Sequence, residues 1–182
     1  MHVIWYTAMS MDGRIADSRD SLDFLDTIGT ADESGDDFGT FLAGIDAVIV
    51  GASTLRGRLR GGHGWPHGDL PTWLVTHDES LLAAASGGAA PVRRVSGALE
   101  PVFAEIEAAG CANVWLAGGG SIAGQALALD RIDEVVVTVA PVAVGAGPSL
   151  FDAAGLPPRR FRLVECRAAG GDAVYLRWLR DR

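Results

Sequence analysis

Three consecutive glycines at residues 118–120 separate two segments of different character. Residues 114–117 are short and apolar, which is typical of a buried strand. Beyond the glycines, apolar residues recur at helical spacing from Ile122 onward. Glycine permits close approach of the backbone to a ligand, and the first N–H groups of a helix attract an anion. With the hydroxyl of Ser121 beside it, this turn is predicted to bind phosphate, and an ordinary tight turn is the alternative.

A second strand end carries the same kind of chemistry. Residues 45–50 form an apolar run, and Gly51 follows it directly. Ser53, Thr54 and Arg56 come next in a stretch compatible with a helix, so two hydroxyls and a cation follow the strand end. We therefore predict a second anion-binding turn at this glycine.

Two carboxylates begin a predicted helix over residues 36–42, which carries Phe38 and Phe41 on its apolar face. Acidic residues in a first turn interact favourably with the helix dipole. Helix capping is therefore one role for Asp36 and Asp37, and at least one of the two is expected to have only that role.

The histidines and cysteines do not form a metal-binding pattern. His63 and His67 are four residues apart, but the neighbouring glycines and Pro66 argue against a helix that would pair them on one metal ion. Cys111 and Cys166 are single and far apart in the sequence. We expect both thiols to be small core residues in a reducing compartment, and we expect no metal site.

The chain has 182 residues, of which 48% are hydrophobic, and its net charge is −8. This length suits one domain, residues 1–182, with a sizeable core. The negative charge argues against broad binding to nucleic acid or to anionic membranes. The first residues lack a signal-peptide pattern, and no apolar run is long enough to cross a bilayer. A soluble cytoplasmic protein is therefore expected.

The order of predicted elements indicates an α/β fold, in which parallel strands alternate with helices and an antiparallel β-hairpin closes the chain. Asp12, in the turn after the first strand, is interpreted as a turn residue. Loops are predicted at 57–71 and 83–91, and the hairpin turn at 170–172. Strands are predicted over residues 2–9, 45–50, 72–76, 92–96, 114–117, 132–139, 161–168 and 173–179, and a long helix over 99–109.

Six segments in this order resemble a known family. They are residues 8–16, 46–51, 118–120, 132–135, 141–142 and 145–151. The sequence resembles the dihydrofolate reductase-like superfamily. Within that superfamily, it is most similar to the reductase domain at the C-terminus of the riboflavin-biosynthesis deaminase/reductases and to the stand-alone relatives of that domain. The resemblance implies a mostly parallel sheet flanked by helices, an oxidoreductase activity of the 5-amino-6-(5-phosphoribosylamino)uracil reductase or dihydrofolate reductase type, and a homodimer.

The resemblance also implies NADPH as the cofactor, bound across the carboxyl edge of the sheet, and a cis peptide between the first two glycines of the triplet. The nicotinamide is expected near Ala8 and Ile15. The phosphates and the adenosine are expected near Gly51, Ser53, Thr54, Thr76, His77, Ala117, Gly118, Gly119, Gly120, Ser121 and Ile122.

By the same analogy, Tyr6, Ser10 and Phe41 face the substrate, and Asp37 supplies the proton. Two positions depart from the family pattern. Tyr6 replaces a lysine of the riboflavin enzymes, and Ala52 replaces an arginine that holds the 2′-phosphate in folate reductases. The expected function is an NADPH-dependent reductase of a small heterocyclic or carbonyl substrate, and the alternative is a nucleotide-binding protein of the same fold without turnover.

Overall fold

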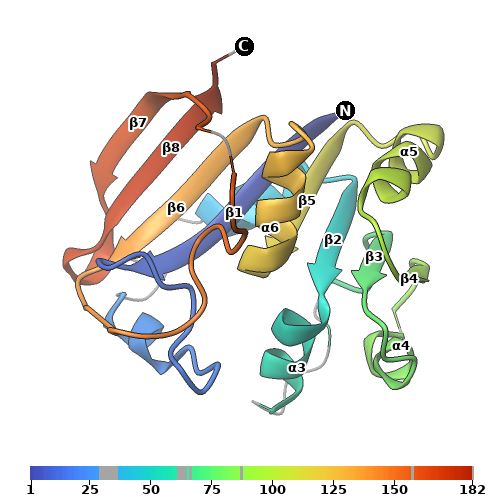
Figure 1. The fold of residues 1–182 in the computed structure, drawn as a ribbon, viewed down its shortest axis with the longest axis horizontal. Helices are drawn as coiled ribbons and strands as arrows, with labels where there is room; N and C mark the ends of the chain where they lie inside the picture. Colours follow the sequence, from blue (N-terminus) through green and yellow to red (C-terminus); the bar gives the residue numbers. More distant parts are fainter. Residues whose placement is uncertain (29–36, 61–64, 66, 87, 157, 182) are drawn as a thin grey trace.

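An eight-stranded sheet runs through the computed structural model, which describes residues 1–28, 37–60, 65, 67–86, 88–156 and 158–181. Its strand order is β4-β3-β2-β5-β1-β6-β8-β7 (Figure 1). Six strands are parallel, and β8 pairs antiparallel with both β6 and β7. The predicted fold class is confirmed. The strands are β1 (His2–Ser10), β2 (Ala47–Gly51), β3 (Thr72–Val75), β4 (Val92–Val95), β5 (Asn113–Gly118), β6 (Glu134–Ala140), β7 (Phe161–Ala168) and β8 (Val174–Arg180).

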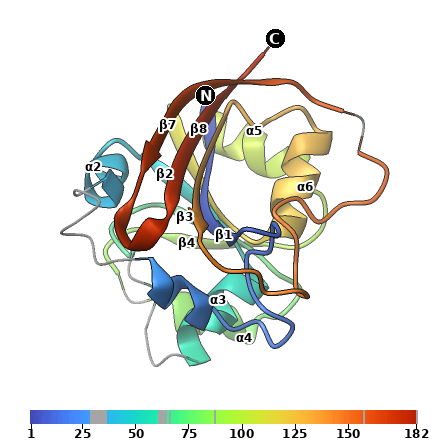
Figure 2. The ribbon, with the colours of Figure 1, turned by 90° about the vertical axis from the view of Figure 1, so that its left-hand side faces the viewer.

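The central strands are apolar on both faces because helices cover both sides of the sheet. Helices α5 (Glu100–Ala108) and α6 (Gly120–Ala128) pack on one face, against a core that includes Trp5 and Leu116. Figure 2 shows α2 (Asp37–Ala43) on the opposite side. On that side, Ile4 and Trp115 belong to a second core cluster, because successive residues of a strand point to opposite faces.

Two helices depart from the sequence-based expectation. Helix α3 (Ala52–Arg60) continues four residues into the predicted loop 57–71, and α4 (Ser80–Ala85) begins before the predicted loop 83–91 and extends into it. In both cases tertiary packing outweighs local propensity, since Leu55, Leu81 and Ala85 are buried in one cluster beneath β2 and β3.

Two shorter elements frame the first loop and the terminal hairpin. A 3₁₀ helix, η1 (Asp23–Thr27), lies in the segment after β1, and a second, η2 (Gly170–Asp172), forms the turn of the hairpin as predicted. Cys166 on β7 is exposed and Cys111 is half-buried, so the expectation that both are core residues is wrong. Cys166 lies on β7, which is an edge strand of the sheet. None of the described helices is long and apolar enough to cross a membrane.

Candidate functional site

The carboxyl ends of β1, β2, β3 and β5 lie along one edge of the sheet, because these strands are parallel. This arrangement brings the two predicted anion-binding turns together, since β2 and β5 are direct neighbours. In open α/β sheets, ligands bind in the crevice outside the carboxyl ends of the strands.

Gly119 lies at the centre of this edge. A Cβ atom placed on it would lie 3.4 Å from Ser53 Oγ, 3.6 Å from Thr54 Oγ1 and 3.9 Å from Ile15 Cδ1. Three segments that are remote in the sequence therefore converge on bare backbone at the start of α6, with two hydroxyls beside it. The peptide between Gly118 and Gly119 is cis, as the resemblance implied. We call this arrangement of Ile15, Ser53, Thr54 and Gly119 the glycine cradle.

Gly120 and Gly51 of the two turns are packed against neighbouring segments. A Cβ on Gly120 would lie 2.1 Å from the Ser149 carbonyl oxygen, and the Gly120 carbonyl accepts a hydrogen bond from the Asp152 amide at 3.0 Å. A Cβ on Gly51 would lie 3.2 Å from Ile122 Cδ1. Gly120 and Gly51 therefore let neighbouring segments approach, and these two residues, like Ile122, are buried beneath the cradle.

Thr76 and His77 lie at the end of β3, where the adenosine end of a cofactor is expected. The Thr76 hydroxyl accepts a hydrogen bond from the Asp78 amide at 3.0 Å, and His77 is exposed. Arg56 donates to Asp78 at 2.9 Å. The Ser80 hydroxyl, and after it Arg56, lower the pKa of the Asp78 carboxyl. Arg56 thus has an internal partner in Asp78, whereas His77 is exposed at this strand end.

Ser10 and Asp12 form a tie between two loops. The Ser10 hydroxyl donates to Asp12 Oδ1 at 2.6 Å and accepts from the Arg14 amide at 3.0 Å. Asp12 also accepts from the amides of Val144 and Gly145, at 3.0 and 2.8 Å. Ser10 is fully buried. Its hydroxyl therefore stabilises the turn, and its contact with a substrate stays a prediction.

The electrostatics of this tie follow from its hydrogen bonds. The Ser10 hydroxyl, followed by the Val144 and Gly145 amides, lowers the pKa of Asp12 to about 2. The carboxylate is therefore ionised at neutral pH. The turn role assigned to Asp12 from sequence is correct. No local sequence pattern predicts its hydrogen bonds to the amides of residues 144 and 145.

Aromatic side chains gather on the face of the sheet that α2 covers. Tyr6 on β1 meets Phe41 of α2 with ring centroids 4.6 Å apart, and the Trp115 indole donates to the Tyr6 carbonyl at 3.1 Å. Phe38 is 5.4 Å from Trp115 and retains 41% of its surface exposed. We call this group the aromatic cluster; its members are Tyr6, Phe38, Phe41, Trp65, His67 and Trp115.

Comparison with known proteins places the chain in a family. Residues 65–175 match the model of the RibD C-terminal domain, which is more than half of the chain. The chain belongs to the RibD C-terminal domain family. An uncharacterized protein of Bacillus subtilis (strain 168), YwjB, is 29% identical over 154 residues, 81% of each chain.

Solved structures with this fold include other RibD-type proteins. A putative riboflavin biosynthesis protein from Shewanella sp. PV-4 matches with a TM-score of 0.84 and 25% identity over 100% of both chains. A pyrimidine reductase-like protein from Corynebacterium diphtheriae matches with a TM-score of 0.72 and 18% identity, over 100% of this chain and 92% of that chain. A third structure is a diaminohydroxyphosphoribosylaminopyrimidine deaminase/5-amino-6-(5-phosphoribosylamino)uracil reductase from Thermotoga maritima. It matches with a TM-score of 0.71 and 15% identity, over 99% of this chain and 56% of that chain.

The remaining predicted residues of this RibD C-terminal domain are only partly placed. Asp37 is the first residue of α2, one position before Phe38 of the aromatic cluster, and its side chain lies outside the described part of the structure. Asp36 and His63 also lie outside the described residues. Ala8 is half-buried on β1, in register with Thr138 of β6. Within the described residues, no three His, Cys, Asp or Glu side chains gather in a way that would hold a metal ion.

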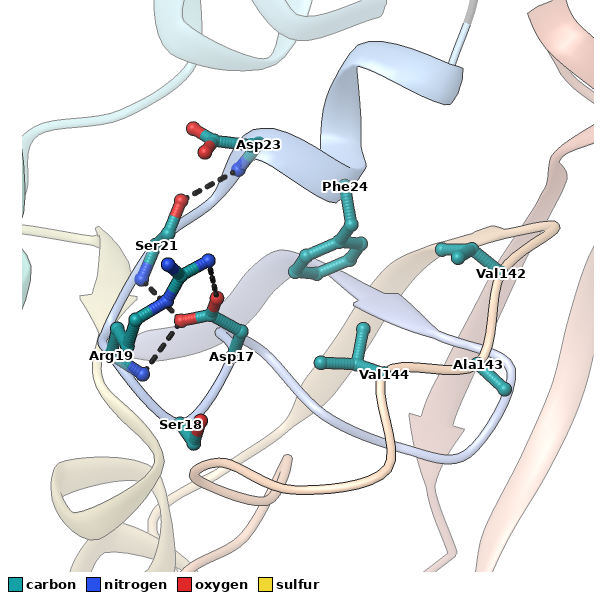
Figure 3. A pocket seen from close by; sticks show the side chains of 9 residues that line it. All are labelled: Asp17, Ser18, Arg19, Ser21, Asp23, Phe24, Val142, Ala143 and Val144. Carbon is teal, nitrogen blue, oxygen red and sulfur yellow. Dashed lines mark hydrogen bonds and ion pairs between the residues drawn. The ribbon is translucent and has the colours of Figure 1, made fainter.

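A cleft of about 470 Å³ lies beside the cradle in this RibD C-terminal domain, between the loop after β1 and the loop after β6. Figure 3 shows Phe24 directed toward Val144 on its apolar side, while Asp17 accepts hydrogen bonds from the Arg19 and Ser21 amides at the rim, at 2.7 and 2.8 Å. None of the residues that line this cleft was predicted from the sequence as a site residue. It shares its first loop with the cradle, because Ile15 belongs to the same loop.

Proposed function

We propose that this RibD C-terminal domain is an NADPH-dependent reductase that transfers hydride to a small heterocyclic or carbonyl substrate. One observation carries the proposal, namely the convergence of Ser53, Thr54 and Ile15 on the bare backbone of Gly119. A cofactor phosphate suits this place, since the first N–H groups of α6 have no partner within the helix and the dipole of α6 favours an anion. NADPH, when bound, supplies the hydride.

The residues of the chain then divide into two groups. Gly118, Gly119, Ser121, Ser53 and Thr54 hold the phosphates at the cradle. Thr76 and His77 lie toward the adenosine, and Ala8 and Ile15 border the nicotinamide. The open backbone of the cradle and the hydroxyls of Ser53 and Thr54 support this assignment.

On the substrate side, Tyr6 and Phe41 supply aromatic surface against which a flat ring packs. Asp37 is the proposed proton source. Acid catalysis near neutral pH requires a group that can deliver a proton to the substrate at that pH. Orientation of the substrate against the nicotinamide is the other contribution that the chain makes to the rate.

A screen for cofactor oxidation tests this function. Purified protein is mixed with NADPH and a panel of heterocyclic and carbonyl compounds, and loss of NADPH absorbance is followed. We expect NADPH binding and turnover of at least one compound. The competing proposal, a nucleotide-binding protein without turnover, is favoured by Tyr6 and Ala52, which replace a lysine and an arginine of the related enzymes. Tight NADPH binding with no oxidation across the panel would support that alternative.

A further inference from the structure

Two arginines meet at one carboxylate at the edge of the sheet opposite the glycine cradle, where β6 begins at Glu134 in register with Leu179 of β8. Arg180, the last residue of β8, donates from Nη2 to Asp130 Oδ1, and Arg159 Nε lies 3.4 Å from the same oxygen atom. Because both guanidinium groups approach one oxygen atom, they lie side by side. We call Arg159 and Arg180 the arginine pair.

The arginine pair retains donor nitrogens without an acceptor. Arg180 Nε and Nη1 and Arg159 Nε are buried, and none of the three forms a hydrogen bond with the described residues. Arg14 and Arg58 each have one such atom, so an unpaired Nε alone does not mark a site. Arg180 differs from them because it has two unpaired nitrogens, its side chain is only 9% exposed, and a second guanidinium lies beside it. Buried donors without an acceptor are costly, so this place favours a group with several acceptor oxygens.

The charges around the pair do not cancel. The two guanidinium groups carry two positive charges, and Asp130 is the one carboxylate that forms an ion pair with them in the described part of the chain. The arginines next to these residues in the sequence have carboxylates of their own, since Arg131 pairs with Glu107 at 3.1 Å and Arg160 with Asp181 at 3.8 Å. One positive charge is therefore left over at the pair, in a chain whose net charge is −8.

The carboxylate of Asp130 is placed so that another anion can displace it. Its side chain is 55% exposed, in contrast to that of Arg180. The backbone of Asp130 is held independently, because its amide donates to the Leu127 carbonyl at 3.1 Å beyond the end of α6. Rotation of this one side chain into water would open both guanidinium groups without any change in the backbone.

We propose that the arginine pair binds the phosphate group of a small phosphate monoester, which displaces the carboxylate of Asp130. Three unpaired donor nitrogens match the three terminal oxygens of a monoester, and guanidinium groups form charge-assisted hydrogen bonds with phosphate. The nine residues of α6, about 14 Å in length, separate this site from the cradle at the other end of the helix. It is therefore a second ligand site, and it does not depend on the proposed reductase function.

A purely structural role for the pair is the competing explanation. In that case the two guanidinium groups only fasten the end of β8 and the segment before β7 to the end of α6. Both explanations expect Asp130→Asn to lower stability, because an ion pair is lost. They differ in ligand binding, since only a phosphate site becomes stronger when the competing carboxylate is removed.

Methyl phosphate and dimethyl phosphate are matched probes for this site. At pH 8 the monoester has three terminal oxygens and close to two negative charges, whereas the diester, which resembles a lipid phosphate, has two such oxygens and one charge. Amide chemical shifts in nuclear magnetic resonance titrations give both the affinity and the place of binding. We expect shifts at residues 130, 159 and 180, and a preference for methyl phosphate of about tenfold.

Four variants then identify the groups that bind. Arg159→Gln and Arg180→Gln should each weaken binding of methyl phosphate about tenfold, and Asp130→Asn should strengthen it by a similar factor. Asparagine suits this position because φ of Asp130 is 61°, a conformation that asparagine tolerates. Arg160→Gln, which removes an arginine with a different partner, should leave the affinity unchanged.

The proposal would be overturned by equal affinities for the two probes, by unchanged affinity in Arg159→Gln, or by weaker binding in Asp130→Asn. Shifts confined to residues 119–122 would place the phosphate at the cradle alone and would equally refute a second site. If Arg180→Gln does not fold by circular dichroism, Arg159→Gln, whose original side chain is 26% exposed, decides the outcome. No step of this experiment uses NADPH, so its failure would leave the reductase function untouched.

Discussion

Asp12 Oδ2 accepts a hydrogen bond from the Gly145 amide at 2.8 Å, although 133 residues separate the two in the sequence. Together with the Val144 amide and the Ser10 hydroxyl, this contact joins the loop after β1 to the loop after β6. Both loops border the cleft of Figure 3. The loop after β1 approaches the start of α6 through Ile15 near Gly119, and the loop after β6 approaches it through Ser149 near Gly120. The shape of the candidate site therefore depends on a carboxylate that does no chemistry in it.

The first prediction concerns the pH dependence of this tie. Because the pKa of Asp12 is about 2 in the folded protein and 3.8 in an unperturbed aspartate, its contribution to stability is present above pH 3.8 and is lost as the pH falls through about 2. Asp12→Asn keeps the side-chain size but loses one acceptor oxygen. We expect a lower urea midpoint for Asp12→Asn at pH 7 and a smaller difference between variant and wild type near pH 2. A difference that does not shrink with acid would show that the charge is irrelevant to the tie.

The second prediction concerns the glycine cradle. In Gly119→Val the side chain enters the space between Ser53 and Thr54, where a phosphate is proposed to bind. We expect the affinity for NADPH, measured by calorimetry, to fall about tenfold or more, which corresponds to about 1.4 kcal/mol. Ala128→Val, at the exposed far end of α6, is the control and should bind NADPH normally. Unchanged affinity in a folded Gly119→Val protein would exclude this placement of the phosphates.

The third prediction concerns the choice between NADPH and NADH. A 2′-phosphate gains charge-assisted hydrogen bonds from cations that face it. Ala52 contributes none, and Arg56 is already paired with Asp78. We expect a preference for NADPH of about tenfold, which His77→Gln reduces and Arg56→Gln changes less. Equal affinities in the wild type would show that His77 does not reach the phosphate, and a preference of about a thousandfold would reveal a stronger site elsewhere.

The fourth prediction separates the two roles of Asp37. Asn caps a helix nearly as well as Asp, so Asp37→Asn should leave stability nearly unchanged. If the carboxylate supplies the proton, kcat with an active substrate should fall about a hundredfold or more, with NADPH affinity unchanged. Full activity in Asp37→Asn would assign the proton to another group and leave Asp37 as a cap.

The fifth prediction concerns the edge of the sheet. β7 is an edge strand, and Leu163 on it is 50% exposed. Unpaired strand edges and exposed apolar side chains favour association, so we expect a homodimer in sedimentation experiments. Leu163→Lys should shift the equilibrium to the monomer, whereas Leu129→Lys, on an exposed leucine beyond α6, should not. A monomeric wild type at micromolar concentration would refute the dimer.

The sequence by itself determined the elements whose apolar pattern is strong. The central parallel strands β2 and β5 are nearly continuous apolar runs in the sequence because helices cover both of their faces, and the final hairpin is predicted as two strands around Gly170 and Gly171. The strand–glycine–helix junction at Gly118 was equally visible, since glycine changes what the backbone can do locally. Helix α4 was missed in part because it is short and is stabilised mainly by burial of Leu81 and Ala85.

Only the tertiary structure decided what individual side chains do. The sequence places Ser10 and Asp12 in one predicted turn. Only the fold shows that Asp12 accepts hydrogen bonds from the amides of Val144 and Gly145. Gly119 and Gly120 are adjacent, yet one faces Ser53 and the other meets Ser149. Local patterns encode the type of an element through its periodicity, whereas partners far apart in the chain are set by packing that no local pattern records.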